Sequence, residues 1–184
     1  MSISVIVLII LGLLTLVIIF IYNSFIQLVN RTNEAWADID VQLRRRYDLI
    51  PNLIDLVKVY AKHEKAVFEN VTRARSKALN ATTIHEKETA DNLVRLALGK
   101  LIAIAEDYPQ LRASENFSKL QDELTETENI IASARRFYNG NVRDLNTKME
   151  TFPDNLIAKL FNFQKREYFQ IDQQAVKADI NVKY

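Results

Sequence analysis

Histidine and acidic side chains are the first place to look for chemistry in this chain. His63 and His85 are each followed by Glu-Lys, so the tripeptide HEK occurs twice. A metallopeptidase helix carries a second histidine four residues after the first, which places both imidazoles on one face. Neither histidine has that second one, and there is no glycine-rich phosphate loop and no G-x-S-x-G turn. We therefore expect no metal, no cofactor and no enzymatic activity. A metal-dependent hydrolase built around His63 and Glu64 is the alternative from another class.

A second concentration of charge lies in the segment RRRYDLIPNLIDLV, residues 44–57. Arg46 and Glu64 both fall at positions where the surrounding pattern is apolar. A charge at such a position costs stability unless it is paired, and it can fix helix register or oligomeric state. We predict interaction roles for six residues of this region: Arg44, Arg45, Arg46, Asp48, Pro51 and Glu64.

The charges at Arg46 and Glu64 need partners outside their own helix. The helix expected after Ser114 offers both signs: Glu123, Glu126 and Glu128 on one half, and Arg135, Arg136 and Arg143 on the other. We hypothesise that the two helices lie side by side with matched charges. The three arginines at 44–46 lie about 33 Å along a helix from the apolar N-terminal segment, beyond the reach of screened attraction to lipid headgroups. They should therefore face protein.

A stripe of amides and arginines recurs on the later helix at spacings of 7, 3, 4 and 3 residues. Its members are Asn129, Arg136, Asn139, Arg143 and Asn146. A solvated helix face is one explanation. Asparagine is a poor helix former that is usually retained for hydrogen bonding, so a polar seam against another helix or subunit is the other.

The elements that must position these residues are long helices. From Phe25 the apolar residues fall into two columns seven apart, a spacing typical of a coiled-coil seam or of a bundle core. The columns are Phe25, Thr32, Ile39, Arg46, Leu53, Tyr60, Val67 and Ala74, and Val29, Trp36, Leu43, Ile50, Val57, Glu64, Val71 and Ala78. The pattern predicts one helix that continues through Pro51 with a kink; a hairpin with Pro51 in the first turn of a new helix is the alternative.

Two further helices follow a lapse of the pattern at residues 80–83. Thr83 and Glu86 have the form of a capping box, and that helix should stop near Tyr108-Pro109, because the residue before a proline leaves the helical region. The next helix should begin at Ser114 and be the second longest. Its seam comprises Phe117, Leu120, Leu124, Thr127, Ile131, Ala134, Tyr138, Leu145 and Phe152.

The C-terminal part is apolar and aromatic at first and then polar. Residues 155–169 should pack across the bundle, with binding to a membrane surface as the alternative. Residues 170–184 should be poorly ordered unless a partner holds them.

The N-terminal segment Ile3 to Tyr22 is uncharged and long enough to cross a hydrocarbon core as a helix. A cleaved signal peptide is the rival, but the run is too long and no basic residue precedes it. Every Lys and Arg follows the run, which favours an N-terminus outside and a C-terminal domain in the cytoplasm.

Composition limits the partners. The chain has 24 Lys and Arg against 23 Asp and Glu, a formal net charge of +1, so a field that would hold nucleic acid is absent. There is no cysteine, which excludes disulfides, thiolate chemistry and a lipid-modified cysteine. Only three glycines and three prolines occur, as expected for few, long helices.

Several motifs resemble those of the LemA family. They are AW-x-x-ID-x-QL-x-RR-x-DLIPNL from Ala35, YP-x-L at Tyr108, TEN-x-I-x-x-AR-x-FYN from Thr127 and FP-x-NLIA from Phe152. Departures are Gly140, where an acidic or small helix former is expected, and a less basic segment at residues 29–32. The resemblance covers almost the whole chain. It implies a bacterial single-pass membrane protein with an outward N-terminus and a cytoplasmic antiparallel bundle, without agreed catalytic residues; some relatives are involved in magnetosome membrane formation.

Together these observations predict an all-α protein in which one N-terminal transmembrane helix continues into a long antiparallel helical bundle with coiled-coil-like seams. We expect an anchor at residues 1–24, a bundle at 25–163 and a polar tail at 164–184. The expected function is that of a scaffold or adaptor at the bacterial inner membrane, with an accessory sensor for a membrane protease as a further alternative. Expected partners are the lipid bilayer, a second copy of the chain and an unidentified membrane or cytoplasmic protein, but no nucleic acid.

Overall fold

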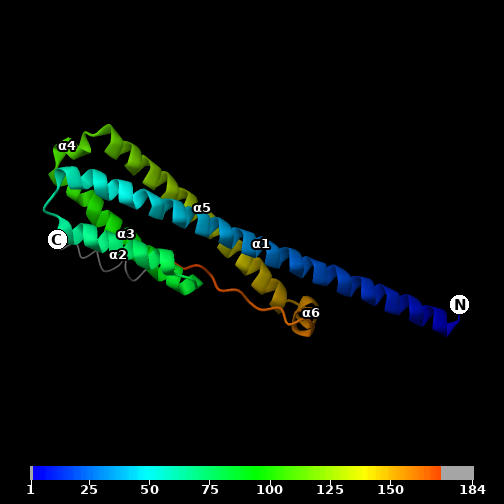
Figure 1. Cartoon of the computed structure of the whole chain (residues 1–184). Coiled ribbons are helices and arrows are strands. Elements are labelled where there is room, and N and C mark those ends of the chain that lie inside the picture. The colour runs from blue at the N-terminus through cyan, green and yellow to red at the C-terminus, as the bar shows by residue number, and fades with distance from the viewer. Residues whose placement is uncertain (1, 171–184) are drawn as a thin grey trace, which may run out of the picture. The chain divides into compact units, whose positions relative to one another are not determined.

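The computed structural model describes residues 2–170, and every regular element in that range is an α-helix (Figure 1). The helices are α1 (Ile3–Tyr60), α2 (Lys65–Asn80), α3 (Ile84–Asp107), α4 (Pro109–Arg112), α5 (Glu115–Glu150) and α6 (Asp154–Leu160). The expected all-α class is confirmed. The expectation for the tail beyond residue 170 lies outside the described residues.

Helix α1 is continuous for 58 residues and contains Pro51 in its interior. A proline inside a helix removes one backbone hydrogen bond and costs about 3 kcal/mol or more. Burial on both sides of the proline offsets this cost, since Ile50 and Leu53 are 0% and 1% exposed. The continuous helix that the sequence favours is therefore confirmed over the hairpin.

The first helix is shorter than the apolar columns predict, and this part of the prediction is wrong. Helix α1 ends at Tyr60, a turn occupies residues 61–64, and α2 begins at Lys65. Glu64 lies in this turn at the start of α2, so it is not a charge inside a continuous seam. The turn allows α2 to bury Phe68, Val71, Ala74 and Ala78 against other helices of the same chain, including α3. Burial of that face outweighs continuation of one long helix.

Helix α3 begins with the predicted capping box. The Glu86 amide donates to Thr83 Oγ1 at 3.2 Å, and the Thr83 amide donates to Glu86 Oε2 at 3.0 Å. Hydrogen bonds from the backbone amides of Thr83 and Thr82 to the Glu86 carboxylate lower the pKa of Glu86 to about 2. The helix ends at Asp107, just before Tyr108-Pro109, as predicted.

Helix α5 is the second longest element, as expected, and most of its predicted seam is buried. Phe117, Leu124, Ile131, Tyr138 and Leu145 are at most 7% exposed. Phe152 is an error in that seam, because its side chain is 76% exposed. The helix ends at Glu150, so the helical period does not extend to Phe152.

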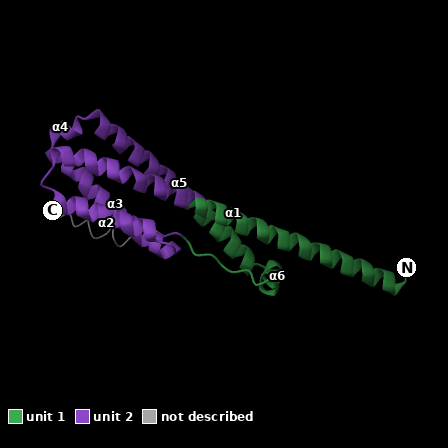
Figure 2. Ribbon diagram, viewed as in Figure 1, with its two compact units in different colours: residues 1–37, 136–168 green, residues 38–135, 169–184 purple. Residues whose placement is uncertain are grey.

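The chain divides into two compact units, to both of which α1 and α5 contribute (Figure 2). Unit 1 comprises residues 1–37 and 136–168, and its core contains Phe25, Leu145 and Ile157. Unit 2 comprises residues 38–135 together with residues 169–170 of the described chain. Its helices α1, α2, α3 and α5 bury Leu43, Ile50, Val71 and Leu101, among others. The residues with predicted interaction roles are distributed over both units.

Candidate interaction site

Arg46 is the most deeply buried charged residue of the predicted set, with 2% of its surface exposed. Its Nη1 donates to Glu128 Oε2 on α5 at 2.5 Å, and its Nη2 faces Asp91 Oδ1 on α3. The sequence predicted an acidic partner on this later helix, and Glu128 confirms it. The pairing holds α1, α3 and α5 at one level inside unit 2.

Asp91 joins Arg46 to a second buried arginine. Its Oδ2 accepts a hydrogen bond from Arg135 Nη2, and the two residues are 2% and 7% exposed. The guanidinium of Arg135 also stacks 4.9 Å from the centre of the Phe169 ring. We call Arg46, Asp91, Glu128 and Arg135 the charge cluster. Arg46, Asp91 and Arg135 are buried, whereas the Glu128 side chain is 42% exposed at the edge of the cluster. Two positive and two negative groups make the cluster neutral, which lowers the cost of burying its charges.

Burial changes the acid–base properties of the cluster. Loss of solvent lowers the pKa of the Arg46 guanidinium below its ordinary value, and the Glu128 carboxylate opposes that shift. Burial lowers the pKa of Arg135 in the same way, again opposed by Glu128. Both arginines stay charged near neutral pH because guanidinium starts from so high a pKa. Their charge is neutralised inside the protein, so we expect them to fix helix register rather than to hold an external anion.

The sequence did not identify Asp91. It stands three residues before Val94 and seven before Leu98, a spacing that places all three on the buried face of α3. Arg135 was named as a partner for the Glu64 charge, but it pairs with Asp91 instead. Its signal was its position seven residues after Glu128 on α5. Spacing could therefore have marked both residues as inward-facing, although their charge suggested a solvent-exposed position.

An open groove of about 450 Å³ is lined in part by Arg46 and Glu128 of the charge cluster. Leu98, Ile102 and Leu124 supply its apolar surface. Its polar lining consists of Arg46, Arg95, Gln121, Thr125, Glu128 and Asn129. Gly99 also lines it, and a Cβ added there would meet nothing within 4 Å. The α3–α5 groove, as we call it, can accept a side-chain ridge of mixed polarity.

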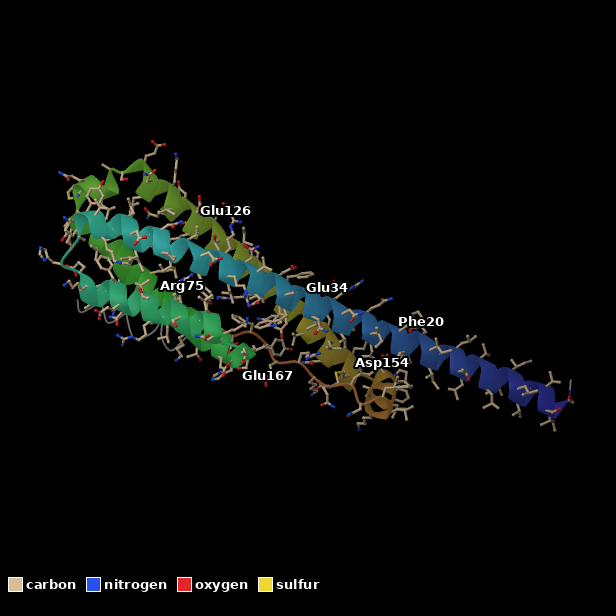
Figure 3. The ribbon with its side chains drawn as sticks, in the orientation of Figure 1. Phe20, Glu34, Arg75, Glu126, Asp154 and Glu167 are labelled. Carbon is tan, nitrogen blue, oxygen red and sulfur yellow. The ribbon has the colours of Figure 1, made fainter. Side chains whose placement is uncertain are left out.

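Pro51 and Arg75 explain why a proline is compatible with a packed helix. The amide that Pro51 lacks would bond to the carbonyl of Tyr47, four residues earlier. That carbonyl instead accepts a hydrogen bond of 2.7 Å from Arg75 Nε on α2 (Figure 3 labels Arg75). Arg75 Nη2 also lies 3.7 Å from Asp48 Oδ1. The proline thus leaves a backbone acceptor of α1 available to α2.

The remaining residues of the arginine segment lie on the surface. Arg44 pairs with Asp40 one turn earlier at 3.3 Å, and its side chain is 65% exposed. Arg45 is exposed, and Glu64 is half-buried at the turn before α2. The structure therefore brings only Arg46 of the three arginines into the charge cluster.

The amide and arginine stripe of α5 has no single environment. Asn129 lines the α3–α5 groove in unit 2. In unit 1, Asn146 Nδ2 donates to the Arg166 carbonyl at 2.9 Å, and its Oδ1 accepts from the Arg166 amide at 3.0 Å. Arg143 is exposed and lies 3.3 Å from Asp144. Arg136 is exposed and Asn139 half-buried on the same helix.

Asn146 and Tyr138, two turns apart on α5, hold a non-helical segment of the same chain. The Tyr138 hydroxyl donates to the Glu167 carbonyl at 2.8 Å, beside the two bonds between Asn146 and Arg166. Asn146 therefore makes hydrogen bonds as a seam residue would, but it bonds the backbone of Arg166 in a non-helical segment of the same chain and not another helix or subunit.

The histidines lie apart from the charge cluster. His63 is exposed in the turn between α1 and α2, and His85 Nδ1 lies 3.6 Å from Glu88 on the surface of α3. Within residues 2–170, no group of three or more histidine or acidic side chains is placed to hold a metal ion.

Fold and site together define an all-helical protein with a neutral charge cluster in its core and one helix long and apolar enough to cross a membrane. A family model described as LemA family matches residues 35–184. The chain belongs to the LemA family.

Curated relatives include magnetosome proteins. MamQ 2 and MamQ 1 of Paramagnetospirillum magneticum (strain ATCC 700264 / AMB-1) are each 24% identical to the chain over 175 residues. These alignments cover 81% of this chain and 64% of each relative, so the chain spans less than two thirds of their length. Protein LemA of Metamycoplasma hominis is 24% identical over 156 residues, which cover 82% of this chain and 69% of that relative.

Proposed function

We propose that this protein is a membrane-anchored helical scaffold that docks an amphipathic helix of another protein chain in the α3–α5 groove. The groove is the observation that carries the proposal. Its apolar surface from Leu98, Ile102 and Leu124 lies beside polar groups that include Arg95 and Asn129. That combination suits a helix whose apolar residues enter the groove while its polar residues meet the edges.

The apolar columns of α1, which first suggested self-association, are used within the chain. Ile39, Leu43, Ile50 and Val57 are at most 1% exposed. A partner must therefore use another surface, and the groove supplies one. A second copy of the chain remains one protein that could provide the helix.

The anchor in this proposal is the N-terminal part of α1. Residues 3–17 are all exposed, and their side chains are almost wholly apolar. Exposed apolar surface of that length is stable in a hydrocarbon core and not in water. We place the anchor in a bacterial inner membrane with the N-terminus outside, because every Lys and Arg follows the apolar run.

Crosslinking in the native membrane tests the scaffold. A photo-crosslinking amino acid replaces Thr125, an exposed residue at the groove. We expect adducts with a defined protein, or with a second copy of the chain. Gly99→Phe places a ring in the groove and should reduce adduct formation several-fold. Ala103→Phe, at an exposed position of α3 outside the groove lining, is the matched control and should not. Absence of protein adducts, or equal adducts from both variants, would contradict docking in the groove.

A further inference from the structure

The short helix α6 buries its inner face and leaves a large apolar outer face exposed. Ile157 and Ala158 are 8% and 3% exposed and belong to the core cluster of Ile21, Phe25 and Leu145. The exposed apolar residues on and around the helix are Phe152 at 76%, Leu156 at 57%, Leu160 at 70% and Phe161 at 48%. Large exposed apolar side chains concentrated in one short segment are typical of an interaction surface. We call these four residues the α6 outer face.

The α6 outer face lies next to the end of the apolar run of α1. The ring of Phe161 is 4.8 Å from that of Tyr22, the last residue of the run. Ile18, one turn earlier, packs against the same cluster as Ile157. Figure 3 shows Phe20 on α1 and Asp154 at the start of α6. Helix α6 therefore contacts the last turn of the run, a stretch of about 6 Å from Ile18 to Tyr22.

We propose that α6 is an interfacial helix whose outer face enters the lipid of the leaflet in which the apolar run of α1 ends. The inference rests on the proposed membrane span. A bilayer that covers residues 3–22 of α1 reaches the level of Ile18 and Tyr22, and so reaches α6. Interfacial helices bury their apolar side about 5–10 Å into the boundary between headgroups and acyl chains.

The chemistry of the segment suits that boundary better than it suits water. Tyr22, whose ring contacts that of Phe161, is one of the two residue types enriched at headgroup level because its ring is amphipathic. Lys159 is exposed between Leu156 and Leu160, and its long side chain can keep the ammonium among headgroups while its carbons lie in lipid. Lipid is favoured over a protein partner because this face continues the exposed apolar surface of α1, and a bilayer that covers one must border the other.

The test uses the full chain, which contains no cysteine, so single cysteines can carry an environment-sensitive fluorophore. Leu160→Cys reports on the α6 outer face. Val17→Cys, 51% exposed in the apolar run, reports on the span itself. Phe137→Cys is the matched control, since Phe137 is an aromatic residue of α5 that is 60% exposed but lies about 20 Å before the end of that helix.

Each labelled protein is placed in phosphatidylcholine nanodiscs and quenched either by iodide in the water or by lipids with a nitroxide high on the acyl chain. We expect the label at 160 to resist iodide and to be quenched by the lipid nitroxide several-fold more than the label at 137. Equal quenching of 160 and 137 by iodide would overturn the inference. A label at 160 shielded from both quenchers would also overturn it, because protein and not lipid would then cover the face. If the label at 17 is not reached by lipid quenchers, the proposed span itself fails, which is a separate outcome.

Discussion

At the scale of single residues, Asp91 links the two arginines of the charge cluster, since one of its carboxylate oxygens faces Arg46 and the other faces Arg135. Asp91→Asn keeps the size of the side chain but leaves Arg46 and Arg135 with one negative charge between them. Uncompensated charge in a protein interior costs several kcal/mol, so we expect the free energy of unfolding to fall by about 3–5 kcal/mol. Urea unfolding of the full chain in detergent, followed by circular dichroism, measures the change.

The control for this variant is Asp55→Asn on α1. Asp55 also pairs with a base, Lys58 at 3.9 Å, but its side chain is 77% exposed. An exposed pair contributes little, so the change should stay within about 0.5 kcal/mol. If both variants unfold at the urea midpoint of the parent protein, the cluster is not buried as described.

At the scale of elements, the contact between α1 and α2 depends on a proline and an arginine acting together. Arg75→Met removes the hydrogen bond to the Tyr47 carbonyl and should lower the free energy of unfolding by about 1–2 kcal/mol. In a Pro51→Ala background an amide is present at residue 51 to bond the same carbonyl, so Arg75→Met should cost less. A double-mutant cycle measured by urea unfolding gives this coupling directly.

Arg73→Met is the matched control on α2, because Arg73 is exposed two residues earlier on the same helix. It should cost little in either background. The cycle could also contradict this explanation. If Arg75→Met lowers the free energy of unfolding equally with proline and with alanine at residue 51, the amide that Pro51 lacks is not the reason why the Tyr47 carbonyl can bond Arg75.

At the scale of the whole molecule, the net charge of +1 gives no long-range field, so placement in a membrane must come from the apolar helix. We predict that the N-terminus lies outside the cell membrane. Ser2→Cys should react with a membrane-impermeant maleimide on intact cells, whereas Gln110→Cys on α4 should react only after lysis. Gln110 is exposed, so its protection would reflect the membrane and not the fold. The reverse pattern of labelling would contradict the orientation.

The sequence predicted the helices well where the signal is local. The capping box at Thr83 and Glu86 and the stop before Pro109 depend on groups within one or two turns. The end of α1 at Tyr60 was not predicted, because the seven-residue spacing of Val57, Glu64 and Val71 continues unbroken through the turn. That turn depends on how α2 buries its apolar face against distant parts of the chain, which no local pattern contains.

For the candidate site, periodicity identified Arg46 as an inward-facing charge and the later helix as a source of its partner. Asp91 was not predicted, because it follows the charged run HEKE at residues 85–88 and so resembles part of a solvent-exposed helix face. The amide and arginine stripe of α5 was recognised in the sequence. Its spacing could not show that Asn146 binds the backbone of Arg166, twenty residues away.

The sequence by itself determined that the chain is helical, which helix faces are buried and which segment is apolar enough for a membrane. These follow from the order of side chains along each helix, because helical geometry projects a fixed spacing onto one face. The tertiary structure alone decided that Asp91 joins two arginines, that Arg75 uses the carbonyl released by Pro51, and that α6 packs beside the last turn of the apolar run. Each of these pairs residues that are distant in the sequence, and such pairs are set by packing between helices.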